Sequence, residues 1–243
     1  LTLPSPAATG SLGANKSILV DTTLPTVSGF SSTTVDGSYK ASASINITAT
    51  LSEIVATAAS ITVTLSNSQT VVLTHNSETN TLTGSYTVGA GQSSADLGVS
   101  SYALTTAPAD IAGNVMTSTT MPDGNISGTR AIVVDTTLPT VSSFSSTTAD
   151  GAYKVGSTIN ITATLSEAVT AAASITVTLD NGKTVVLTHN AVNNTLTGTY
   201  TVAAGDTSAD LTVSSYALTS APVDAAGNIM TDTTVPSLSL IHI

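Results

Sequence analysis

The sequence predicts an all-β chain of two tandem antiparallel β-sandwich domains joined end to end. Three observations predict this: a long internal repeat, apolar residues with a period of two inside each repeat, and turn residues between the apolar runs. Hydrophobic residues make up 41% of the chain, so the chain can bury cores. Thr and Val are abundant, which suits a pleated and half-buried surface. Neither repeat carries a sustained helical period.

The repeat is read directly from the sequence. Asp21–Val27 recurs as Asp135–Val141, 114 residues later, and the register then continues without a gap, with most paired positions identical. We therefore predict a first repeat at residues 21–134 and a second at 135–237. Each repeat is too long for a solenoid unit and has the size of a small domain.

Both ends of the chain depart from this pattern. Residues 1–20 are predicted to be the C-terminal strand and linker of a truncated preceding repeat, because Ser-Ile-Leu-Val at 17–20 matches Ala-Ile-Val-Val at 131–134. Residues 238–243 match a common sequencing adapter translated in one frame, which predicts a scar; the alternative is an ordinary apolar tail. The second repeat then lacks its last strand, and we expect it to have an open edge and lower stability.

Within the first repeat, apolar residues alternate with polar ones between turn signals. Ile45, Ile47 and Leu51 lie on one face of one predicted strand. In the same way, Ile61, Val63 and Leu65 lie on one face of the next. Asp36-Gly37 is one of the turn signals that separate the runs. This pattern predicts seven strands, at 24–32, 43–52, 60–66, 69–75, 80–89, 96–104 and 128–134.

Composition excludes several functional classes. The chain has 15 acidic and 5 basic residues, so it lacks the clustered cations that nucleic-acid binding needs. No apolar run approaches the roughly 20 residues of a membrane-spanning helix, so we expect no direct membrane insertion. The absence of cysteine excludes thiolate catalysis and Cys-ligated zinc. Aromatic residues are 3% of the chain and none is Trp, which disfavours a sugar-stacking platform.

Four motifs recur in fixed order in both repeats. They are Val-Asp-Thr-Thr-x-Pro, Asp-Gly-x-Tyr-Lys, Leu-Ser-Glu-x-Val and Asp-x-Ala-Gly-Asn, which begin at Val20, Asp36, Leu51 and Asp110 in the first repeat and at Val134, Asp150, Leu165 and Asp224 in the second. With these motifs the chain resembles the bacterial immunoglobulin-like tandem repeats of giant extracellular adhesins and surface proteins. The resemblance implies immunoglobulin-like domains on the bacterial cell surface. It also implies a non-catalytic spacer, often rigidified by calcium at domain junctions.

Acidic residues from separate segments are predicted to meet at one end of each domain. Antiparallel strands return the chain to the pole where it entered, which gathers Asp21, Glu53, Asp110 and Asn114. The second set is Asp135, Glu167, Asp224 and Asn228. Three carboxylates in one place repel one another unless a cation lies among them, and calcium takes six to eight oxygen ligands. The alternative is that these Asp and Asn residues only form turns.

The sequence thus predicts a non-enzymatic stalk whose structural partners are neighbouring repeats of the same chain. No residue pattern identifies a distal ligand. A glycan- or protein-binding module is the alternative, acting through loops or through strand addition at an exposed edge. An accessory domain of a secreted enzyme is a further alternative.

Overall fold

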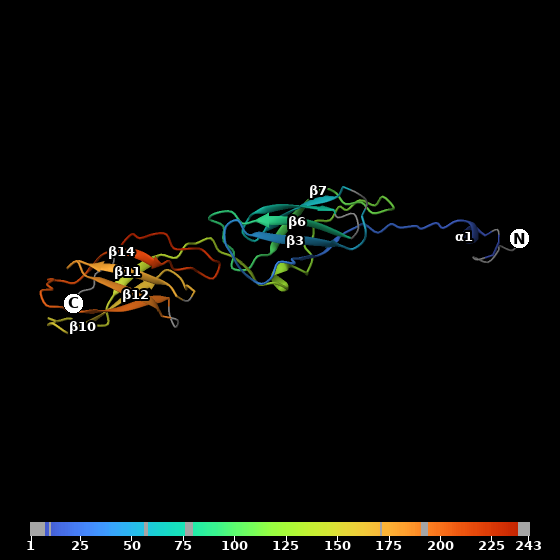
Figure 1. The fold of residues 1–243 in the computed structure, drawn as a ribbon. Helices are drawn as coiled ribbons and strands as arrows, with labels where there is room; N and C mark the ends of the chain where they lie inside the picture. Colours follow the sequence, from blue (N-terminus) through green and yellow to red (C-terminus); the bar gives the residue numbers. More distant parts are fainter. Residues whose placement is uncertain are drawn as a thin grey trace. The chain divides into compact units, whose positions relative to one another are not determined.

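The computed structural model describes residues 8–9, 11–55, 58–75, 80–170, 172–190 and 194–237, and it is all-β (Figure 1). The chain divides into two compact units. The first comprises Leu1–Asp36, Ser44–Thr87 and Ser94–Ile132, and the second comprises Gly37–Ala43, Val88–Ser93 and Val133–Ile243. Each unit contains one curled, six-stranded antiparallel sheet.

The sheet of the first unit has the strand order β1-β3-β6-β5-β4-β7. Its strands are β1 (Val27–Ser31), β3 (Ser44–Leu51), β4 (Ser60–Leu65), β5 (Thr70–His75), β6 (Thr81–Thr87) and β7 (Val99–Thr106). Each of them overlaps a strand predicted from the sequence. A separate two-stranded sheet pairs β2 (Gly37–Tyr39) with β8 (Ile132–Val134). Strand β2 was not predicted, because it is short and directly follows a turn signal.

The sheet of the second unit repeats this order as β9-β10-β13-β12-β11-β14. Its strands are β9 (Val141–Ser145), β10 (Thr158–Leu165), β11 (Ser174–Leu179), β12 (Thr184–Asn190), β13 (Thr195–Thr201) and β14 (Val213–Ser220). Residues 151–153, which correspond to β2, form no strand. The structure therefore has the predicted internal repetition with one local difference.

The period of two in the sequence becomes an inner and an outer face of each sheet. In β3 every second residue is at most 1% exposed, and the residues that alternate with them are partly exposed; the buried ones are Ile45, Ile47, Ala49 and Leu51. The core also contains an aromatic pair, Phe30 and Tyr102, packed edge to face with ring centroids 5.6 Å apart. Such a pair stabilises a core by about 0.5–1.5 kcal/mol beyond the area it buries. The second unit repeats the pair with its corresponding Phe and Tyr.

Helical structure is minor in the described residues. It consists of the single turn α1 (Leu12–Asn15) and the 3-10 turn η1 (Ile126–Gly128), which lies at the start of the seventh predicted strand. Neither helix is long or apolar enough to cross a membrane, and the described part of the chain contains no other helix that is. Residues 16–20 form no strand, although their counterparts in the first repeat include β8.

Candidate metal centre

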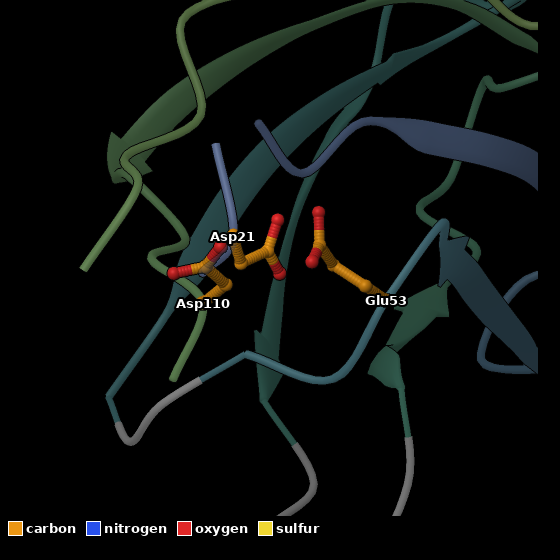
Figure 2. Close-up of side chains that lie close together, drawn as sticks. All are labelled: Asp21, Glu53 and Asp110. Carbon is orange, nitrogen blue, oxygen red and sulfur yellow. The ribbon is translucent and has the colours of Figure 1, made fainter. Parts of the chain in front are cut away.

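Three carboxylates from distant segments gather in the first unit. Asp21, Glu53 and Asp110 each offer an oxygen, and these oxygens all lie within 4.8 Å of one another. Figure 2 shows the Asp21 carboxylate between those of Asp110 and Glu53. The same residues line a depression of about 360 Å³. The structure therefore brings together the three acidic residues that the sequence predicted to converge.

Asp110 is the most buried member of the cluster, with 4% of its surface exposed. Its Oδ1 accepts the backbone N–H of Asn114 at 2.8 Å, and its Oδ2 accepts the side-chain N–H of Asn114 at 2.7 Å. Burial raises the pKa of Asp110, but these donors and the nearby backbone N–H groups outweigh it, so that the net pKa is lowered. Asp110 is thus held as a carboxylate in a fixed orientation.

Asp21 is held on the segment that precedes β1. Its Oδ1 accepts the N–H of Thr23 at 2.9 Å, an Asx turn within the Asp-Thr-Thr motif. Its backbone carbonyl accepts the side-chain N–H of Asn114 at 3.1 Å. Asn114 therefore donates to both aspartates and acts as a positioning residue. Direct ligation of a cation by its amide oxygen stays a prediction.

Glu53 follows the end of β3, where the chain is clamped to the entry segment. The N–H of Ser52 donates to the carbonyl of Thr26, and the Ser52 hydroxyl accepts the N–H of Thr26 at 3.0 Å. The Oε1 atom of Glu53 is buried and has no hydrogen-bond donor within the described structure. Burial, followed by the negative charges of Asp21 and Asp110, raises the pKa of Glu53. A buried oxygen without a donor, close to two other carboxylates, is available to ligate a cation.

The second unit repeats this arrangement. Asp135, Glu167 and Asp224 also offer oxygens within 4.8 Å of one another. Asn228 donates from its backbone and side chain to Asp224 and from its side chain to the Asp135 carbonyl. Glu167 again has a buried Oε1 without a donor in the described residues, and its pKa is raised by burial and then by the two aspartates. The full geometry, and not only the sequence, is therefore duplicated.

Two positioning interactions were missed by the sequence reasoning. The hydroxyls of Ser52 and of its counterpart Ser166 accept the backbone N–H groups of Thr26 and Thr140, which fixes the strand end that carries the glutamate. The Asx turns at Thr23 and Thr137 fix the aspartate that begins each repeat. Ser52, Ser166, Thr23 and Thr137 all lie inside motifs that are identical in both repeats, so the repetition itself was the available signal.

The donor set suits a hard divalent cation. Three carboxylates supply up to six oxygens, which are the ligands that calcium takes at about 2.3–2.6 Å. The two N–H donors of Asn114 orient the Asp110 carboxylate and help to keep it charged. No protein-family model matches this chain, and no curated protein matches it. The inference that this site binds a cation therefore rests on these residues alone.

Proposed function

We propose that this chain is a non-catalytic spacer from a bacterial cell-surface adhesin, made of immunoglobulin-like repeats rigidified by calcium. One observation carries the proposal: the same three-carboxylate cluster is built twice, each time with one aspartate from the segment that enters a repeat. The four shared motifs support the family assignment, and the curled antiparallel sheets are compatible with immunoglobulin-like sandwiches. The extracellular surface is the compartment that this assignment implies.

Calcium would act by fixing the entry segment to the body of its own repeat. Asp21 lies on that segment. Glu53 follows the C-terminal end of β3, and Asp110 lies after the C-terminal end of β7. A cation shared by the three replaces mutual repulsion with attraction. Pro25 already limits the segment by fixing its own φ and restricting Leu24 to extended geometry. A segment held at both its proline and its aspartate has little remaining freedom, which suits a stiff stalk.

A catalytic function finds no comparable support in these clusters. Acid–base hydrolysis by a carboxylate pair needs a cleft that places substrate between the two groups. Here the most buried carboxylate is committed to Asn114, and the Glu53 carboxylate lies beside two aspartates with which it can share a cation. The geometry serves ligation of a cation better than proton transfer to a substrate.

Calcium titration tests the proposal directly. Isothermal calorimetry of the chelator-treated chain should show two calcium ions bound per chain, one for each cluster. Calcium should raise the melting temperature, and small-angle scattering should show a stiffer particle with calcium than with chelator. Identical melting and scattering in the two conditions would refute the proposal. Equal stabilisation by sodium would show ionic strength to be the cause.

A further inference from the structure

A lysine in the second compact unit reaches the loop of the carboxylate cluster in that unit. Lys40 belongs to the segment Gly37–Ala43, which is part of the second unit by its contacts. Its Nζ donates to the backbone carbonyl of Gly227 at 2.9 Å. Gly227 lies in the loop between Asp224 and Asn228, which carries one of the three carboxylates. In the described part of the chain Lys40 forms no ion pair with these carboxylates, so its contact is with the backbone that positions them.

The peptide between Gly227 and Asn228 connects this contact to the carboxylate. The Gly227 carbonyl and the Asn228 N–H belong to one planar trans peptide and point in opposite directions. The N–H donates to Oδ1 of Asp224 at 2.8 Å. An ammonium group on the carbonyl therefore fixes the plane of the peptide and polarises its N–H toward the carboxylate. Lys40 thus acts on Asp224 through a single peptide unit.

The side chain of Lys40 also lies against Gly227 itself. A β-carbon at Gly227 would lie 3.5 Å from the Nζ of Lys40 and 3.8 Å from its Cδ and Cε. The glycine has a φ of +87°, a left-handed conformation that it adopts without steric cost. The aliphatic stem of the lysine therefore covers the turn while its ammonium group binds the carbonyl.

The residue before Lys40 holds the other aspartate segment of the cluster. The carbonyl of Tyr39 accepts the N–H of Asp135 at 3.0 Å. The side chain of Asn228 donates to the Asp135 carbonyl at 3.0 Å and to Oδ2 of Asp224 at 2.7 Å. Tyr39 and Lys40 therefore hold the same two segments that Asn228 joins. Both aspartates of the cluster depend on this short stretch of chain.

We propose that Lys40 is a positioning residue of the second carboxylate cluster: it orients Asp224 for a divalent cation and couples occupancy of the site to the segment Gly37–Ala43. This inference rests on the proposed cation site and names a residue outside its ligand set. Coupling is reciprocal, so a cation that needs Asp224 in this orientation also strengthens the Lys40 contact. In sequence Lys40 belongs to the first repeat. A cation site of the second repeat thus depends on a residue that its own repeat does not contain.

The first cluster sets the expected size of the effect. The N–H of Asn114 makes the same 2.8 Å hydrogen bond to Asp110. Apart from its chain neighbours, no described residue lies within 4 Å of the β-carbon position at Gly113. Gly113 is exposed, whereas Gly227 is half-buried. The hydrogen bond to the carboxylate therefore forms without a lysine, so Lys40 tunes the second site and does not create it.

Calcium calorimetry of the chelator-treated chain tests the proposal. The background variant Glu53→Gln removes a ligand from the first cluster, so that the titration reports on the second. There Lys40→Met, which keeps an unbranched stem, should weaken calcium binding by roughly two- to five-fold, the scale of a contact made by an exposed lysine. Lys40→Arg keeps the charge and the donors and should restore wild-type affinity. Lys154→Met is the matched control, because it removes the same charge from an exposed lysine of the same motif and should have no effect.

Amide hydrogen exchange supplies a readout that does not depend on affinity. In chelator, Lys40→Met should speed exchange at Asn228 and leave Asn114 unchanged. Calcium should slow exchange in residues 37–43 of the wild type and not in Lys40→Met. Unchanged affinity and unchanged Asn228 exchange in Lys40→Met, or an equal loss in Lys154→Met, would overturn this inference and leave the calcium sites in place.

A wild-type chain that binds no calcium would instead refute the proposed function. The exchange rate of Asn228 in chelator would then still decide whether Lys40 positions the loop. A gain in calcium affinity in Lys40→Met would also overturn the inference, because it would show that the lysine acts only by repelling the cation.

Discussion

Replacing Glu53 by Gln should stabilise the first unit when calcium is absent and destabilise it when calcium is bound. Gln has nearly the same shape but no charge, so it avoids both the burial of a charge and the repulsion from Asp21 and Asp110, which together raise the pKa of Glu53. In chelator, the variant should therefore unfold at a higher temperature than the wild type at neutral pH. In calcium it should unfold at a lower temperature, because one carboxylate ligand is lost.

The size of the calcium effect follows from mass action. A cation at 100 times its dissociation constant stabilises the folded state by about 2.7 kcal/mol. For a domain of about 100 residues, 1 kcal/mol shifts the melting temperature by roughly 4 °C, so saturating calcium should raise it by on the order of 10 °C. The duplicated cluster gives an internal control, because Glu53→Gln should remove this shift from the first unit only. Glu167→Gln should remove it from the second unit only.

Differential scanning calorimetry in chelator and in calcium provides the readout. Asp123→Asn is the matched control, since it also removes one negative charge but lies at an exposed position outside both clusters. The control should behave as the wild type in both conditions. The reasoning fails if Glu53→Gln is destabilising in chelator. It also fails if calcium stabilises the variant as much as it stabilises the wild type.

Two other measurements follow from the structure. Calcium affinity should fall between pH 7 and about pH 5, because the raised pKa of Glu53 and of Glu167 lets protons compete with calcium at a higher pH than at an ordinary glutamate. In the calcium-free protein the same two carboxyl groups add stability at acidic pH. This stability is lost as the pH rises through their pKa in the folded state. Ile132→Ala should destabilise the first unit by about 2–5 kcal/mol in urea denaturation and leave the unfolding of the second unit unchanged, because the side chain is fully buried.

The sheets could be predicted because their signal is local and repeated. Strand β3 alternates buried and exposed residues over its whole length, and the same alternation recurs in β10. The gathering of Asp21, Glu53 and Asp110 followed from topology alone, because antiparallel strands return the chain to one pole. Neither inference required knowledge of side-chain packing.

The features that escaped prediction depend on partners far along the chain. Strand β2 consists of three residues after a turn, and it forms against β8 from the end of the same repeat. Its counterpart at 151–153 has nearly the same sequence and forms no strand, so the local sequence alone does not decide the structure there. The dual role of Asn114 was also invisible, since an Asp-x-Ala-Gly-Asn turn does not show which groups its asparagine reaches.

Asp135 takes part both in the backbone pairing that follows β8 and in the second carboxylate cluster. Its N–H donates to Tyr39, its carbonyl accepts from Asn228, and its carboxylate lies in the cluster with Glu167. A residue held through backbone and side chain at once has little freedom to move.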